Sequence, residues 1–328
     1  MMDAPQEFHY RLPGRVSGQR PGSHPGSSIG AGQEFVSHVS LYDRPDPRRL
    51  DLRASLRGLK DEWLVRVNRQ RAGASVRAIV DVSASMMFGG QRPKLHVVAD
   101  FIEALGMSAF RVGDAVGLMA FDEAERPDLY MPARVSRGMG SLMSAALREV
   151  CEAGGVADDA RATRGRTGAG QSASVGGAHA SRSYNGASIA HQAHAYNRIA
   201  DGLEDAASRL AGQQGLVFLV SDFHWPLERL DIALDLMAHA GVVPVIVWDP
   251  AETEPPTRDA LASLRDAETG ARRTIWLRPW LRKEWRRSVE QRRAEIDSFF
   301  AAHAIRPFYV EGAFDADALS RYFFEADL

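Results

Sequence analysis

Cysteine is nearly absent from this sequence: Cys151 is the only one in 328 residues. A lone cysteine cannot form an internal disulfide or a thiolate zinc cluster, so the sequence indicates a reducing compartment. A small buried apolar residue is a more ordinary interpretation of Cys151 than a reactive thiol.

Long apolar runs are also missing. Runs such as "GLVFLV" and "GVVPVIVW" are far shorter than the about 20 residues of a membrane helix, and the N-terminus lacks the apolar core of a signal peptide. We therefore expect a cytoplasmic protein without direct membrane insertion.

An excess of charge of one sign is missing too. The formal net charge is −2, so bulk electrostatics gives no reason to expect nucleic-acid binding. The exception is local: a helix predicted over 280–304 carries arginines at positions 282, 286, 287, 292 and 293. This helix presents either a polyanion-binding face or a solvated charged face. The second is favoured, because Glu284, Glu290, Glu295 and Asp297 are spaced to pair with the arginines.

Strand-like apolar runs alternate with helical periodicity from residue 76 onward. The predicted strands are "VRAIVDV", "AVGLMAFD", "GLVFLVSDF" and "VVPVIVWD". This alternation predicts an α/β fold, a doubly wound and mostly parallel sheet with helices on both faces. We expect two parts: an N-terminal arm with an accessory strand over 1–75, and the α/β domain over 76–328. The first 34 residues read as an extended arm or loop. The Gly-rich insertion at 154–188 is expected to be a mobile loop, either disordered or ordered by a partner.

Oxygen-bearing side chains follow two of the predicted strands. "VDVSAS" places Asp81, Ser83 and Ser85 at one strand end, and "LVSDF" places Asp222 at another. Ligands of open parallel sheets bind at the carboxyl ends of strands. Hydroxyls with few carboxylates suit Mg²⁺ or Mn²⁺ more than Ca²⁺ or Zn²⁺. The plainer alternative is a helix cap at Asp81 or Ser83 and a turn residue at Asp222.

Catalytic motifs are absent. Ser83 or Ser85 could act as a nucleophile with Asp222 and His224, but the G-x-S-x-G elbow that exposes such a serine is missing. A phosphatase that used Asp81 would more naturally carry aspartate where Ser83 stands. No G-x-x-x-x-G-K-[ST] motif is present to bind ATP. A transition-metal site from His179, His191 and His194 is a further alternative, without a nearby carboxylate. We expect no enzymatic activity.

"DVSASM" followed by "LVSDF" resembles the metal-ion-dependent adhesion site of von Willebrand factor A domains. Upstream, "HPGSSIGAGQEF" and "LYDRPDPRRLDLRASLR" resemble one bacterial branch, the domain-of-unknown-function proteins encoded beside MoxR-type AAA+ ATPases. Within it, MxaS-like proteins of methanol-oxidation gene clusters are similar. The resemblance implies a non-catalytic, metal-dependent interaction module that works with the ATPase to mature or activate a client, such as methanol dehydrogenase. Mg²⁺ would lie on Asp81, Ser83, Ser85 and Asp222, and an Asp or Glu of the partner would complete the shell.

The sequence departs from this family pattern at its fifth ligand, a threonine. Thr163 and Thr167 lie far upstream inside the insertion, and Ser188, Tyr196 or Asn197 would have to substitute. The family's "R-Y" and "D-W" pairs also read Leu41–Tyr42 and Asp51–Leu52 here. The second hypothesis is therefore a metal-independent scaffold with a degenerate metal site.

Overall fold

The computed structural model describes residues 7–15, 20–30, 32–58, 62–162, 198–256, 261–265 and 272–325. Its centre is a six-stranded sheet in the order β11-β8-β7-β4-β5-β6. All neighbours in it are parallel except β6, which is antiparallel to β5. The strands are β4 (Ser75–Asp81), β5 (Ala115–Phe121), β6 (Met131–Arg134), β7 (Gly215–Ser221), β8 (Ala240–Trp248) and β11 (Phe308–Glu311). The predicted α/β fold with a mostly parallel sheet is confirmed.

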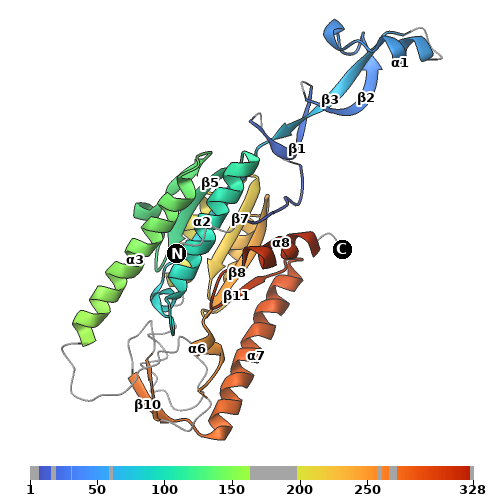
Figure 1. Cartoon of the computed structure of the whole chain (residues 1–328). Helices are drawn as coiled ribbons and strands as arrows, with labels where there is room; N and C mark the ends of the chain where they lie inside the picture. Colours follow the sequence, from blue (N-terminus) through green and yellow to red (C-terminus); the bar gives the residue numbers. More distant parts are fainter. Residues whose placement is uncertain are drawn as a thin grey trace.

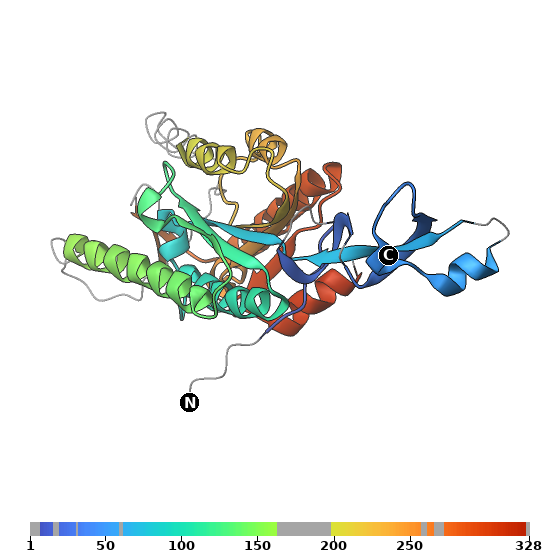
Figure 2. The same ribbon diagram turned by 90° about the horizontal axis from the view of Figure 1, so that it is seen from above.

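Helices cover both faces of this sheet (Figures 1 and 2). On one face lie α2 (Lys94–Val112), α3 (Met139–Ala162) and α8 (Ala316–Glu325). On the other lie the helical residues 198–208, α5 (Leu230–Leu236) and α7 (Pro279–Ala302). The short α6 (Pro250–Thr253) follows β8. β9 (Leu261–Arg265) and β10 (Arg272–Trp276) form a separate two-stranded antiparallel sheet.

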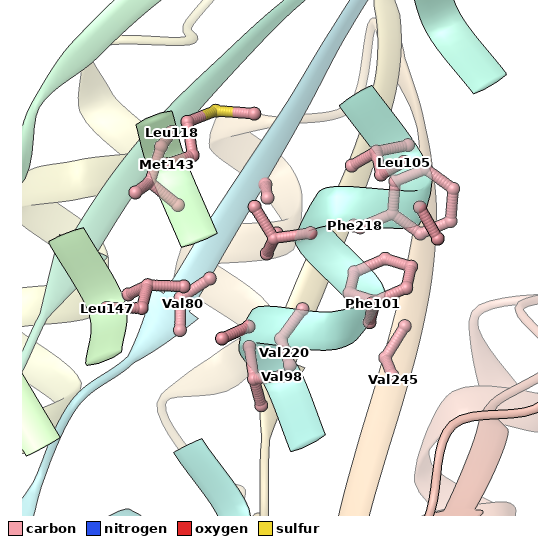
Figure 3. Packing of buried hydrophobic residues seen from close by; sticks show 14 of the residues in the cluster. Val80, Val98, Phe101, Leu105, Leu118, Met143, Leu147, Phe218, Val220 and Val245 are labelled. Atoms are coloured by element: carbon pink, nitrogen blue, oxygen red, sulfur yellow. The ribbon is translucent and has the colours of Figure 1, made fainter. Parts of the chain in front are cut away.

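The face under α2 and α3 carries the larger hydrophobic core. Val80 of β4 and Phe218 of β7 meet Phe101 of α2 and Met143 of α3 there (Figure 3). The rings of Phe101 and Phe218 lie 5.3 Å apart in an edge-to-face arrangement, which suits the charge distribution of aromatic rings. Every residue of β4 from Val76 to Asp81 except Arg77 is buried. This pattern explains why the strand appears in the sequence as a nearly continuous apolar run.

An antiparallel sheet forms an arm that projects from this body (Figure 1). It consists of β1 (Pro21–Gly30), β3 (Leu64–Ala72) and β2 (Glu34–Ser40), in the order β1-β3-β2. The 3-10 turn η1 (Pro47–Arg49) and α1 (Leu52–Arg57) connect β2 to β3. This segment lies in an arm, one of the two forms predicted for the first 34 residues, but β1 within it is a strand that the sequence does not predict. Its Gly, Pro and Ser residues carry no strand signal, but their backbone pairs with β3 through an irregular register.

The buried carboxylate of Asp114 connects the arm to the body through hydrogen bonds. α2 ends at Gly113, whose φ of 81° is left-handed as a helix C-terminus favours, and Asp114 follows it fully buried. Asp114 accepts hydrogen bonds from the Tyr10 hydroxyl (2.5 Å), the His24 Nε2 (2.7 Å) and the Ala74 backbone N–H (2.7 Å). Burial, and then the charge of Asp114, raise the pKa of Tyr10 above its ordinary value. One side chain thus joins the N-terminal segment, β1 and the start of β4.

Phe8 of the N-terminal segment belongs to the core of the body. It is 3% exposed, and its ring centroid lies 6.1 Å from that of Phe101 and 6.3 Å from that of Phe218. Phe8→Ala is expected to lower the free energy of unfolding by about 3 kcal/mol, through lost burial and the cavity left behind. Urea unfolding would measure it. Phe110→Ala on α2, where the ring is 40% exposed, is the control, with a loss below about 1 kcal/mol. Equal losses would contradict the packing of Phe8.

Part of the predicted insertion is helical. α3 continues to Ala162, so the loop predicted from residue 154 is wrong over 154–162. The remainder, from 163 to 188, lies outside the described residues.

The ordinary interpretation of Cys151 holds, since its side chain is buried and free. No described helix has the length and apolar character needed to cross a membrane. In α7, Arg292 pairs with Glu295 and Arg293 with Glu311 of β11, which fits a partly paired charged face.

Candidate functional site

Two adjacent central strands bring the predicted site residues to one edge of the sheet. β4 and β7 pair in parallel, with Val80 opposite Val220. Asp81 ends β4, and Asp222 directly follows β7. Because the carboxyl ends of parallel strands lie at the same edge, the two carboxylates come within reach of one another. Both are fully buried.

Asp81 is held only by neutral donors. Its Oδ1 accepts from the backbone N–H of Ser83 at 2.9 Å, and its Oδ2 accepts from the hydroxyl of Ser221 at 2.6 Å. The indole N–H of Trp225 lies 3.4 Å from the same Oδ2. Burial, followed by the charge of Asp222, raises the pKa of Asp81 to about 6. The neutral donors lower the cost of this buried charge, but no cation offsets it among the described contacts.

Ser83 and Ser85 turn their hydroxyls toward each other. Ser83 precedes the 3-10 turn η2 (Ala84–Met87) without capping it through its side chain. The tight turn brings the two Oγ atoms to 3.3 Å. Ser85 also hydrogen-bonds Asp222 and so helps to lower its pKa. The four predicted residues therefore lie together, while their role as metal ligands stays a prediction.

Asp222 already has a cationic partner inside the protein. The Lys94 ammonium lies 2.7 Å from its Oδ2, and the His224 backbone N–H donates to its Oδ1 at 3.2 Å. Burial alone would raise the pKa of Asp222, but Lys94 and His224 outweigh that effect and hold the pKa well below its ordinary range. Asp222 is thus an ionised carboxylate with its counter-charge in place.

Lys94 also contacts a second carboxylate, Glu252. Its Nζ lies 2.8 Å from Glu252 Oε1, and the Lys94 side chain is only 1% exposed. Burial alone would lower the pKa of Lys94, but Asp222 and Glu252 hold it above its ordinary value. Lys94 is the first residue of α2, where the helix dipole disfavours a positive charge. The charged form of a lysine at this place is therefore stabilised by the two carboxylates.

Glu252 reaches Lys94 because α6 fixes its position. Asp249 caps α6, and its backbone N–H donates to the Glu252 carboxylate, which completes a capping box. The indole of Trp285 on α7 donates to the Glu252 carbonyl at 2.7 Å. Sequence reasoning missed both Lys94 and Glu252 as site residues. The available signals were a lysine that opens a helix and the D-x-x-E spacing of "DPAE".

The residues fit the divalent ion implied by the resemblance only in part. The Ser83 and Ser85 hydroxyls beside the uncompensated Asp81 carboxylate suit a hard cation. However, the Lys94 ammonium contacts Asp222, the second expected carboxylate, and would repel a cation placed against it. Across the described residues, no group of three or more His, Cys, Asp and Glu side chains is arranged to hold a metal. Asp81, Ser83 and Ser85 thus suit a cation, whereas Asp222 already has Lys94 as its counter-charge, and metal binding at this edge stays a prediction.

Several predicted alternatives lie outside the described residues. These are the substitute fifth ligands Thr163, Thr167, Ser188, Tyr196 and Asn197, and the histidine group His179, His191 and His194. His224 is described: its ring stacks on Trp248, and its Nε2 lies 3.6 Å from Glu252 Oε2. Trp225 is 1% exposed and packs in the interior.

The loop after β7 is fixed from the other side by α7. Phe223 has a φ of 50°, which is uncommon for a residue with a side chain. The Arg292 guanidinium donates to the Phe223 carbonyl at 2.6 Å and also to the Trp225 carbonyl. These contacts hold the backbone that carries Asp222.

Three solved structures resemble this chain weakly. BatB, a conserved hypothetical protein from Bacteroides thetaiotaomicron, is 14% identical, with 78% of this chain and 99% of that one covered and a TM-score of 0.34. An aerotolerance-related membrane protein from Bacteroides fragilis is 12% identical, with 77% and 98% covered and a TM-score of 0.37. A von Willebrand factor type A protein from Catenulispora acidiphila is 13% identical, with 67% and 43% covered and a TM-score of 0.24.

No curated protein matches the chain. One family does: DUF58, described as a protein of unknown function, whose pattern matches residues 43–295. The match covers the outer part of the arm and most of the body, including Asp81, Ser83, Ser85, Lys94, Asp222 and Glu252. The chain therefore belongs to the DUF58 family.

Proposed function

We propose that this chain is a non-catalytic protein-interaction module that works with a MoxR-type AAA+ ATPase. Together they would mature or activate a client, which for an MxaS-like member is methanol dehydrogenase. Membership in DUF58 and the mostly parallel α/β fold support the general role. The partner and client rest on the resemblance of "DVSASM", "LVSDF" and the upstream motifs.

The observation that carries this proposal is the exposed apolar tip of the arm. The arm tip consists of Tyr42, Leu52, Leu56 and Trp63, which are 90%, 57%, 80% and 49% exposed. The segments that carry them run side by side, because the Leu41 N–H donates to the Trp63 carbonyl at 2.7 Å and the Asp51 N–H donates to the Leu64 carbonyl at 2.8 Å. Clustered exposed apolar side chains on a projecting element mark an interaction site.

The charges around the arm tip indicate the chemistry of its partner. Asp46 pairs with Arg49 and Asp51 with Arg66, which leaves Asp43 and Glu62 as the acidic residues of this region without an ion pair in the described part of the chain. The arginines at positions 44, 48, 53 and 57 make no ion pair within the described part of the chain. A partner surface that combines acidic groups with an apolar patch would complement this tip. We assign that surface to the ATPase.

Binding of the purified MoxR-type ATPase from the same organism tests this assignment. Leu56→Asp should weaken binding by about tenfold or more, because it places a charge in the apolar contact. Leu142→Asp on α3 is the matched control, since Leu142 is also an exposed helical leucine, at 58%. It should bind like the wild type. Equal binding by Leu56→Asp and wild type, measured by biolayer interferometry, would contradict the proposal.

At the sheet edge, we propose that Lys94 acts as the resident cation and that the module is metal-independent. The support is the pair of contacts at 2.7 and 2.8 Å from the Lys94 ammonium to Asp222 and Glu252. Lys94 neutralises the carboxylate that a divalent ion would otherwise use. It also ties the start of α2 to the end of β7 and to α6.

The second candidate is the metal-dependent module that the sequence favours, with Mg²⁺ or Mn²⁺ and a partner carboxylate at Ser83 and Ser85. The support for it is the 3.3 Å approach of the two hydroxyls beside Asp81. Under this candidate, EDTA abolishes capture of the ATPase or client, and Ser83→Ala does the same. Under the metal-independent module, EDTA leaves binding unchanged.

A further inference from the structure

A cavity of about 740 Å³ lies at the opposite end of the sheet from Asp81 and Asp222. Its walls come from the amino ends of β4, β5, β7 and β8 and from the segments that lead into and out of the arm. The cavity therefore lies where the arm joins the body. Its volume falls in the range of cavities that hold small organic molecules.

The lining of this cavity is positively charged. Arg15, Arg20, Arg77 and His239 line it, together with the polar side chains of Tyr130 and Gln214. Among the described lining residues, none is Asp or Glu. Three arginines that line one cavity favour an oxyanion, because the N–H forks of guanidinium groups match phosphate and carboxylate oxygens.

Arg77 is the least ordinary of these residues. It is the third residue of β4, a central strand, and its backbone lies between Gly117 of β5 and Val217 of β7. Its half-buried side chain makes no ion pair or hydrogen bond within the described part of the chain. Burial lowers the pKa of Arg77, and the Tyr130 hydroxyl is the group that opposes this effect. A half-buried arginine without a carboxylate is costly unless something supplies the counter-charge.

The other arginines of the body show how unusual this is. Arg126 pairs with Asp122 and Asp128, and Arg229 pairs with Asp201 and Glu204. These arginine side chains are about one-third exposed and have carboxylate partners. Arg77 is also partly buried and lacks such a partner among the described residues.

We propose that this cavity binds a small molecule that carries at least two oxyanion charges, either phosphate or carboxylate groups. The Arg77 guanidinium supplies the inner contact, and Arg15, Arg20 and His239 supply the outer ones. The ligand would contact both the body and the base of the arm, since Arg20 is hydrogen-bonded through its carbonyl to the Gly73 N–H at 2.8 Å. This site does not depend on the metal or the partner at the other edge.

Calorimetric titration of the full chain with pyrophosphate and, separately, with citrate tests the proposal. One molecule of at least one probe should bind per chain, and Arg77→Gln should weaken that binding by about tenfold or more, as for loss of a charge-assisted contact. Preference for pyrophosphate would identify a phosphate ligand, and preference for citrate a carboxylate ligand. Arg134→Gln on β6, an exposed arginine outside the cavity, should bind like the wild type.

Two further measurements make the result decisive. If Arg77→Gln does not fold, Arg20→Gln at the exposed rim replaces it, with weaker binding expected. Pyrophosphate and citrate are also salts that can be excluded from protein surfaces and so stabilise a protein without binding to it. The titrations are therefore made at one ionic strength, which is set with NaCl. Lack of binding by both probes would overturn the proposal. So would binding that both Arg77→Gln and Arg20→Gln leave unchanged.

Discussion

Replacement of Lys94 by methionine is expected to lower the free energy of unfolding by about 3 to 5 kcal/mol, because it leaves buried carboxylates without a counter-charge. The Lys94 side chain is 1% exposed, and Asp222 and Glu252 are 0% and 3% exposed. Methionine preserves most of the aliphatic length, so the change isolates the charge. Urea unfolding followed by tryptophan fluorescence in EDTA measures the loss.

Two further variants show whether the loss of stability comes from the buried carboxylates or from the removal of any cation. Arg293→Met breaks the pair with Glu311, in which both side chains are about half exposed, and should cost no more than about 1 kcal/mol. The triple variant Lys94→Met, Asp222→Asn, Glu252→Gln removes the carboxylates as well and should recover much of the stability. A Lys94→Met loss as small as that of Arg293→Met would contradict the role of Lys94.

Asp114→Ala is expected to loosen the arm and to cost about 3 kcal/mol, because it leaves three donors without their shared acceptor. The Tyr10 hydroxyl, the His24 ring and the Ala74 N–H all bond this carboxylate. Hydrogen exchange should become faster over β1 and around Ala74, while β7 keeps its protection. Urea unfolding gives the global loss.

Asp128→Ala provides the control for this prediction. Asp128 is an exposed aspartate paired with Arg126, and its removal should leave exchange in β1 unchanged. Unaltered exchange in β1 of Asp114→Ala would mean that the strand pairing with β3, rather than Asp114, holds the arm.

The sheet could be predicted from the sequence because its strands are buried on both faces. β4, β5, β7 and β8 are mostly apolar, and the helices between them have clear periodicity. β1 escaped prediction because its Gly, Pro and Ser residues contribute backbone pairing rather than side-chain burial. The sequence places Phe8 in a loop, because no local sequence pattern indicates its contact with Phe101 and Phe218.

The part of the site that lies within the two strand-end motifs could be predicted from the sequence. Strand ends indicated that Asp81 and Asp222 would meet, because parallel pairing brings them to one edge. The partner of Asp222 could not be predicted. Lys94 and Glu252 lie 128 and 30 residues from Asp222 in the sequence, and a lysine that opens a helix looks like a surface residue. Only the structure shows that the ammonium is buried between Asp222 and Glu252.

Calorimetric titration of the wild-type chain with Mg²⁺ and Mn²⁺ tests the central claim most directly. If Lys94 is the resident cation of this edge, neither ion binds and the melting temperature is the same in Mg²⁺ as in EDTA. Lys94→Met should then acquire stabilisation by Mn²⁺, since Asp81, Asp222 and Glu252 lack a counter-charge. Binding of Mg²⁺ or Mn²⁺ by the wild type that Ser83→Ala abolishes would contradict the claim and establish the metal-dependent module instead.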